Sequence, residues 1–367
     1  MPFDARDFPA APPANQAAGQ LHRRQVAAWL FTVCALLLVM IALGGATRLS
    51  GAGLSIMEWA PISGLLPPLS EAEWQRLFRL YQTIPQFRLR NPDMDLAGFQ
   101  GIFWLEWVHR FWGRMLGLAF LGPLIWFWAT RRIAPRLGWR LVGIFVLGGL
   151  QGAVGWFMVA SGFFPDAQAV APMRLVVHLG LALALYAAVF WTALHMLRPP
   201  LPGAADAPVL RGITGAASVL LVATMLAGGC VAGLRAGFDY NTFPLMDGQL
   251  VPAGYARLEP FWRNLVENVA TVQFNHRLLA TLSLLCAGLA GIGGWQLAHT
   301  HPARLALVAL GALAALQYSI GVATLLLIVP VDLGTLHQTM AVLVLSAALA
   351  ALHALRPPPR AAWQAPP

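Results

Sequence analysis

The sequence predicts an all-α polytopic membrane protein with eight transmembrane helices, arranged as two pseudo-symmetric four-helix bundles. Three observations predict it. Of the 367 residues, 58% are hydrophobic and 11% charged, whereas a soluble domain carries about a quarter charged residues. Eight apolar stretches are long enough to span a bilayer. Motifs of the second to fourth stretches return in the second half of the chain, about 160–167 residues later.

The eight stretches are separated by short connections rich in arginine. They run over 27–47, 103–129, 139–161, 174–196, 211–233, 268–297, 303–328 and 333–355. Arginine marks the cytoplasmic side of short loops. One side of the predicted bundle collects Arg23, Arg24, Arg131, Arg132, Arg136, Arg140, Arg198, Arg211, Arg304, Arg356 and Arg360. We therefore expect both termini in the cytoplasm.

The N-terminal segment lacks the basic-then-apolar order of a cleaved signal peptide, so we expect its first helix to be retained. The chain then divides into tails, two halves and a linker. These are a tail 1–26, an N-terminal half 27–198 with the outer loop 48–102, a linker 199–210, a C-terminal half 211–356 and a tail 357–367.

The first outer loop contains a predicted amphipathic helix. Ser70 followed by Glu73 is typical of a capping box at a helix start. Trp74, Leu77 and Tyr81 then recur at helical spacing. Their apolar face either rests on the membrane or packs on the protein, and we expect the second.

The internal repeat aligns the helices of the two halves. Gly44-Gly45 at the end of the first span matches Gly228-Gly229 at the end of the fifth. Gln151 and Gly155 in the third span match Gln317 and Gly321 in the seventh. Because each half crosses the membrane four times, the two repeats have parallel orientation.

Four histidines fall at matching places near the outer ends of even-numbered spans: His109 and His178 in the first half, His276 and His337 in the second. A histidine in hydrocarbon is costly and a functional candidate, although a single one is equally well explained by a hydrogen bond to a neighbouring helix. Two imidazoles at one depth on two helices are typical of axial heme ligation. Zinc is disfavoured, because it requires three or four ligands.

Two further histidines, His195 and His353, lie roughly 25 Å along the same helices, at the opposite face. The second and sixth spans carry no histidine there to complete a pair. We expect both residues at the membrane interface.

Charged residues accompany the first histidine of each half. Arg110 and Arg277 follow directly and are expected to meet heme propionates, or alternatively to reach the lipid headgroups. Three residues before His109 stands Glu106, whereas Gln273 takes the matching place in the second half. Glu106 shares a helix face with His109, so one half has an acid–base group, or else Glu106 pairs with an arginine such as Arg110.

Together these residues resemble the heme A synthase family. The likeness rests on Glu106-Trp107-Val108-His109-Arg110, on Asn275-His276-Arg277, on His178 and His337, and on Leu54-Ser55-Ile56-Met57-Glu58-Trp59. It covers nearly the whole chain after the tail and is closest to the branch shared by Gram-negative bacteria and mitochondria, which implies a bacterial inner membrane. Some branches carry a cysteine pair in the outer loops, and this chain does not.

The resemblance implies oxidation of the C8 methyl group of heme O to a formyl group by successive hydroxylations. It implies that His109 and His178 flank the substrate heme, with Arg110 at a propionate. It implies that His276 and His337 ligate a resident heme b, with Arg277 beside it. Glu106 matches the family's essential carboxylate, which we expect to take protons or orient water.

The sequence says little about binding partners. Heme O is the implied substrate, contact with the enzyme that makes heme O stays open because no residue indicates it, and neither the electron acceptor nor the oligomeric state is encoded in a motif. The net charge of +9 does not predict nucleic-acid binding, since no basic stretch is interleaved with stacking aromatics. Two other functions remain: a di-heme b-type cytochrome, and a non-catalytic heme carrier or assembly factor.

Overall fold

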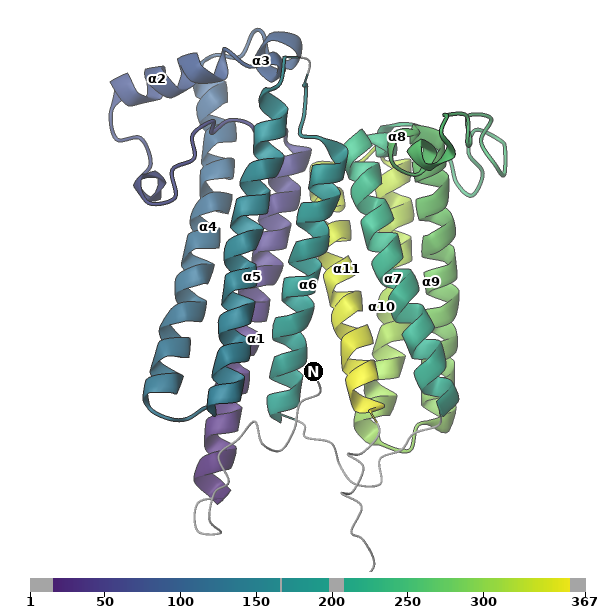
Figure 1. Ribbon diagram of the computed structural model, residues 1–367. Helices are drawn as coiled ribbons and strands as arrows, with labels where there is room; N and C mark the ends of the chain where they lie inside the picture. The colour runs from purple at the N-terminus through teal and green to yellow at the C-terminus, as the bar shows by residue number, and fades with distance from the viewer. Residues whose placement is uncertain (1–15, 166, 198–207, 357–367) are drawn as a thin grey trace, which may run out of the picture.

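The computed structural model describes residues 16–165, 167–197 and 208–356 (Figure 1). Residues 199–207 of the expected linker 199–210, the tail at 357–367, residues 1–15 of the N-terminal tail, Arg198 and Arg360 lie outside the described residues. Residues 208–210 of that linker are helical, because α7 begins at Pro208. Within the described part the chain is helical, without a β-strand. Eight helices are long and apolar enough to cross a membrane, which confirms the predicted fold class.

The spanning helices follow the predicted order closely. They are α1 (Gln16–Leu49), α4 (Leu96–Ala129), α5 (Pro135–Ala160), α6 (Pro172–Leu197), α7 (Pro208–Leu234), α9 (Val269–Leu297), α10 (His301–Leu326) and α11 (Val331–Ala354). Two begin well before the apolar stretch, namely α1 and α4. The α4 start is fixed by Asp95, whose carboxylate accepts a hydrogen bond from the Gly98 amide at 2.8 Å. Hydrophobicity marks the part of a helix in lipid, and both helices continue past it.

The two halves meet along α1, α6, α7 and α11, with equivalent contacts on both sides (Figure 1). A Cβ added to Gly45 of α1 would lie 2.9 Å from the Gln338 side chain of α11. A Cβ added to Gly229 of α7 would lie 3.0 Å from the Leu179 side chain of α6. Gln338 and Leu179 each follow the second histidine of their half. These matched contacts are consistent with the predicted pseudo-symmetry.

The halves differ in how tightly their helices pack. Helices α9 and α10 come together backbone against backbone, because a Cβ on Gly291 would lie 3.3 Å from the Leu307 carbonyl oxygen. Helices α4 and α5 touch each other at far fewer places. A Cβ on Gly117 of α4 or on Gly152 of α5 would meet nothing within 4 Å. The N-terminal half is therefore the more open bundle.

The end of the N-terminal half that faces away from the described N-terminus of α1 carries α2 (Glu71–Tyr81) and α3 (Pro85–Arg90) (Figure 1). The Ser70 hydroxyl accepts from the Glu73 amide at 3.3 Å, as the capping motif predicts. The Trp74 ring meets the Phe103 ring of α4 edge-on, with centroids 4.9 Å apart. Buried partners along this face are Leu77, Phe78 and Tyr81. The prediction that this helix packs on the protein is confirmed, whereas α3 was not predicted.

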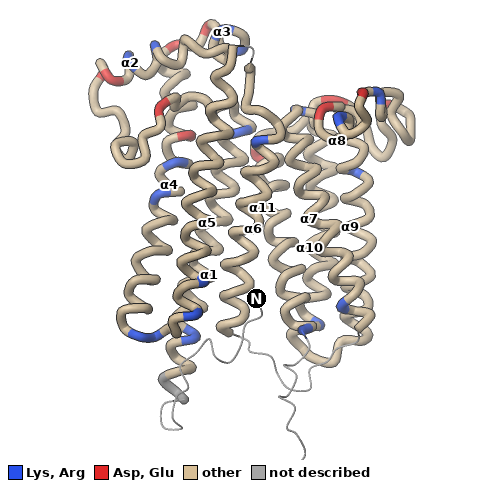
Figure 2. Tube along the Cα trace, viewed as in Figure 1, with Lys and Arg blue, Asp and Glu red and all other residues tan. Residues whose placement is uncertain are grey.

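Charge is distributed unequally between the two ends (Figure 2). The acidic residues that the structure describes lie toward the end with the two long loops, one of which contains α8 (Asn264–Glu267). The opposite end carries arginines only, among its described charged residues. The two ends therefore present different electrostatic surfaces.

Candidate functional site

Four half-buried histidines near the loop end form the candidate site: His109 on α4, His178 on α6, His276 on α9 and His337 on α11. Each imidazole lies against a glycine of a neighbouring helix in its own half. A Cβ on that glycine would approach the ring to 3.3 Å at Gly44–His109, 2.9 Å at Gly155–His178, 3.0 Å at Gly228–His276 and 2.7 Å at Gly321–His337. The first and third helices of each half thus make room for rings on the second and fourth.

The two imidazoles of the C-terminal half lie close to each other. The ring centroids of His276 and His337 are 6.5 Å apart, with planes at 88°. A metal binds imidazole nitrogen at about 2 Å, so two axial rings have centres about 6 Å apart. The Nδ1–H of His276 donates to the Thr224 carbonyl oxygen at 3.0 Å, which leaves Nε2 for a metal. This pair fits an axial heme site.

The pair in the N-terminal half has one orphaned atom. The Nδ1 atom of His178 is buried and has no hydrogen-bond partner. A buried ring nitrogen without a partner is costly, and a bound ion or ligand at that nitrogen would remove the cost. Among the described residues, no group of three or more His, Cys, Asp or Glu side chains is arranged to hold a metal ion. Two-imidazole sites of this kind suit heme, which needs only axial ligands.

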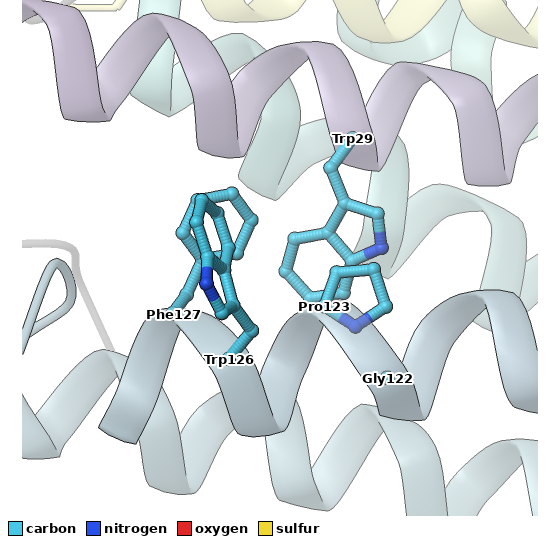
Figure 3. Close-up of a pocket in the computed structure, with 5 residues that line it drawn as sticks. All are labelled: Trp29, Gly122, Pro123, Trp126 and Phe127. Carbon is cyan, nitrogen blue, oxygen red and sulfur yellow. The ribbon is translucent and has the colours of Figure 1, made fainter. Parts of the chain in front are cut away.

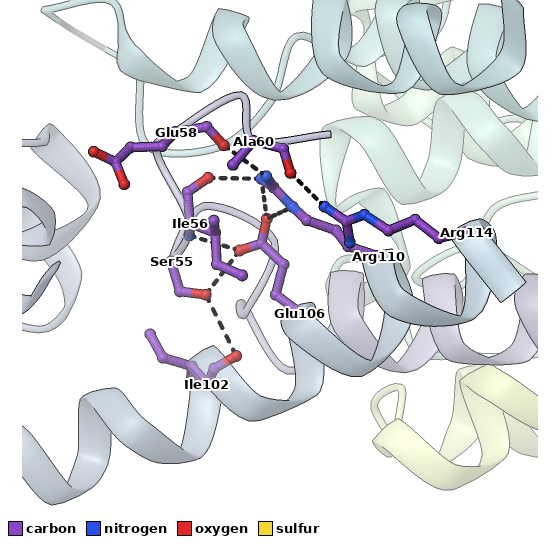
Figure 4. A network of polar contacts seen from close by, with 8 residues as sticks. All are labelled: Ser55, Ile56, Glu58, Ala60, Ile102, Glu106, Arg110 and Arg114. Carbon is purple, nitrogen blue, oxygen red and sulfur yellow. Dashed lines mark hydrogen bonds and ion pairs between the residues drawn. The ribbon is translucent and has the colours of Figure 1, made fainter. Parts of the chain in front are cut away.

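The buried carboxylate of Glu106, only 2% exposed, is fully engaged (Figure 4). Its Oε1 accepts from the Arg110 Nη2 at 2.6 Å and from the Arg110 Nε at 3.0 Å. Its Oε2 accepts from the Ser55 hydroxyl at 2.7 Å and from the Ile56 amide at 2.9 Å. The alternative that Glu106 pairs with Arg110 is confirmed. Its catalytic role stays a prediction.

Arginines of α4 hold the segment that follows α1 (Figure 4). Arg110 donates to the carbonyl oxygens of Ile56 at 2.6 Å and Glu58 at 3.1 Å. One turn further, Arg114 donates to the Ala60 carbonyl oxygen at 2.7 Å. Most N–H groups of Arg110 are thus committed to protein acceptors. The expected contact of Arg110 with a propionate stays a prediction.

The C-terminal half has an equivalent network in which Gln273 takes the place of Glu106 and donates hydrogen bonds to its loop where Glu106 accepts them. The Gln273 Nε2 donates to the carbonyl oxygens of Ala236 at 2.7 Å and Asp239 at 2.6 Å. Its Oε1 accepts from Arg277 at 2.9 Å. Arg277 in turn donates to the Tyr240 carbonyl oxygen at 2.6 Å, and its contact with a propionate also stays a prediction. Glu106 faces hydrogen-bond donors of its loop, which a carboxylate accepts, whereas Gln273 faces carbonyl oxygens, to which an amide donates. This reason for the Glu–Gln difference was missed by sequence reasoning.

His195 and His353 lie in the last turns of α6 and α11 and form a pair that the sequence did not predict, whereas their expected place at the membrane interface stays a prediction. Both rings are buried, at 5% and 3% exposure, and they face each other with centroids 6.3 Å apart. The reason is that α6 and α11 meet at the boundary between the halves, so a pair forms across it and not within one half. Arg356 lies 3.0 Å from the His195 Nδ1, and the Trp191 ring lies 5.1 Å from that of His353. Protein groups surround this second pair.

A pocket of about 580 Å³ lies between the N-terminal part of α1 and the C-terminal part of α4, at the end of the bundle away from the long loops (Figure 3). Its lining is almost entirely apolar. It is formed by Trp29, Gly122, Pro123, Trp126 and Phe127. It contains no residue of the histidine pairs and offers no chemistry to a heme iron.

Comparison with known proteins agrees with this arrangement. The family model described as cytochrome oxidase assembly protein (COX15-CtaA) matches residues 27–349. The chain is 56% identical over 340 residues to a heme A synthase of Granulibacter bethesdensis, covering 92% of this chain and 89% of that protein. It is 44% identical to one of Nitrosospira multiformis (91% and 94% covered) and 47% identical to one of a Methylobacterium species (92% and 94% covered). The chain therefore belongs to the COX15-CtaA family of cytochrome oxidase assembly proteins.

Proposed function

We propose that this chain is a heme A synthase, a membrane enzyme that oxidises the C8 methyl group of heme O to the formyl group of heme A. The observation that carries the proposal is the set of four histidines at one end of the bundle, two in each half, each opposite a glycine. Relatives that share about half of its residues over nearly its whole length bear that name.

The N-terminal half is the proposed substrate site, with His109 and His178 flanking heme O. Its looser helix packing suits a ligand that must enter and leave. The tighter C-terminal half suits a cofactor that stays, which we propose to be heme b, held by His276 and His337. Heme b, when bound there, supplies a one-electron redox centre.

Glu106 is the proposed catalytic carboxylate, acting on protons or water during methyl oxidation. Helical spacing puts it on the face of His109. Of its partners, the Ile56 amide and the Arg110 guanidinium only donate, whereas the Ser55 hydroxyl both donates and accepts. Ser55 is therefore the partner through which a proton on Glu106 can be relayed.

We further propose that Arg110 and Arg277 steer heme propionates by their charge while they hold the two outer loops. The arginine-only end of the bundle supports an orientation with both termini in the cytoplasm, in a bacterial inner membrane.

Heme analysis of membranes tests the proposal. Membranes that contain heme O are compared with and without this chain, and extracted hemes are identified by their masses. Heme A is expected only where the chain is present. A cytochrome or a heme carrier would bind heme and leave heme O unconverted, and that result would overturn the proposal.

A further inference from the structure

Two glutamines that the proposed function does not use occupy equivalent positions in the two halves. Gln151 on α5 lies four residues before Gly155, and Gln317 on α10 lies four residues before Gly321. Residues four apart share one face of a helix. Each glutamine therefore faces the same histidine as the glycine one turn away.

The contacts of the two glutamines match. The Gln317 Nε2 donates to the His337 carbonyl oxygen at 3.0 Å and lies 3.1 Å from the ring Nδ1. The Gln151 Nε2 donates to the His178 carbonyl oxygen at 3.1 Å and lies 3.4 Å from a ring nitrogen. In both residues the other amide atom, Oε1, is buried without a hydrogen-bond partner.

The unpartnered oxygens have a chemical explanation. An imidazole that binds a metal through one nitrogen carries a proton on the other and needs an acceptor for it. For His276 this acceptor is the Thr224 carbonyl oxygen. For His337 the group beside Nδ1 is the Gln317 amide, whose NH₂ cannot accept but whose Oε1 can. A half-turn of the amide exchanges the two atoms.

We propose that Gln317 and Gln151 are positioning residues for the second heme-ligating histidine of each half. When heme binds, the amide turns, gives up its donation to the histidine carbonyl oxygen and moves away from that oxygen, and Oε1 accepts the N–H of the imidazole. This hydrogen bond fixes the ring plane and strengthens electron donation to the iron, which favours the oxidised state. The proposal rests on the proposed function, because it takes His337 and His178 as heme ligands.

The resident heme gives the cleanest test, with a readout that does not depend on activity. Full-length Q317M, Q317E and wild-type protein are purified, and bound heme b, its midpoint potential and its electron paramagnetic resonance spectrum are measured. Ser319→Ala is the matched control, because Ser319 lies two residues away on α10 and is exposed. The potential is expected to rise in Q317M, to stay at or below the wild-type value in Q317E, and to be unchanged in S319A.

Equal potentials and spectra in Q317M and wild type would overturn the proposal. If Q317M loses heme b, retention by Q317E, which keeps an acceptor oxygen, supports the proposal, and loss from both variants contradicts it. The variant H337A distinguishes failure of the ligand assignment from failure of the role given to Gln317. If H337A keeps the wild-type heme spectrum, the ligand assignment in the proposed function fails, whatever Gln317 does.

Discussion

Gly321 lies so close to His337 that a single added methyl group would come within 2.7 Å of the ring Cε1. Real Cβ atoms do not approach a neighbour this closely, so the ring or the helix would have to move. The other three histidines also lie close to glycines on neighbouring helices, with the added Cβ at 2.9 Å for Gly155, 3.0 Å for Gly228 and 3.3 Å for Gly44. The glycines are thus as much a part of the candidate sites as the imidazoles are.

Substitution G321A is expected to weaken heme b binding in the C-terminal half. Overpacking costs about 1–3 kcal/mol, which lowers affinity by roughly 5- to 150-fold. Heme b per chain, from the visible spectrum of purified protein, measures the effect. Gly288→Ala is the control, because a Cβ there meets nothing within 4 Å. Equal heme loss in both variants would mean that the ring contact is not the cause.

Substitution G155A is expected to act on the other half, because a Cβ there would lie 2.9 Å from the His178 ring. Conversion of heme O should fall while the heme b spectrum stays unchanged. Gly152→Ala on the same helix is the control, since its Cβ meets open space. Loss of heme b in G155A would contradict the assignment of separate sites to the two halves.

Substitution E106Q is expected to abolish heme A formation and to leave heme b bound. The amide cannot accept from both Arg110 and the Ser55–Ile56 donors, and breaking a buried ion pair costs about 3–5 kcal/mol. Ser55→Ala removes one hydrogen bond and keeps the ion pair, so it should slow conversion without unfolding the segment. Heme A formed per hour in membranes is the measurement. A normal rate in E106Q would rule out a catalytic Glu106.

The outer loop is expected to loosen in acid through Arg76. Hydrogen bonds from Arg76 hold the pKa values of Glu58 and Glu73 below their ordinary 4.5. Stability from a lowered carboxyl pKa is present above the ordinary pKa and lost as pH falls through the lowered one. Because these side chains are 46% and 41% exposed, the effect is under about 1 kcal/mol.

Hydrogen exchange over residues 55–81 measures this loosening at pH 7 and at pH 3. After correction for intrinsic exchange, wild type should lose protection in acid, whereas R76Q should already be less protected at pH 7 and change less. An identical pH response in both proteins would show that Arg76 is not responsible.

Much of the fold was predictable because a membrane-spanning helix requires a long apolar stretch, which is visible in the sequence. The repeat was also predictable, since His109 and Gly155 have counterparts at matching offsets. The apolar face of α2 indicated packing on the protein, and Trp74 is indeed buried. These features depend on local pattern, which a sequence carries directly.

Other features depend on how separate segments meet. The pairing of His195 with His353 follows from the contact of α6 with α11 across the two halves, and no motif encodes that contact. The exchange of Glu106 for Gln273 follows from whether the facing loop presents amide hydrogens or carbonyl oxygens. Loop backbone orientation is a tertiary property that spacing does not contain.

The direct test of the central claim compares the two histidine pairs, whose ring centroids are 6.5 Å and 6.3 Å apart. Bound heme b is measured in purified H276A, H337A, H195A and H353A. We predict loss of heme b from the first two variants and retention in the last two. Heme b retained in H276A and H337A, or lost only from H195A and H353A, would contradict the account.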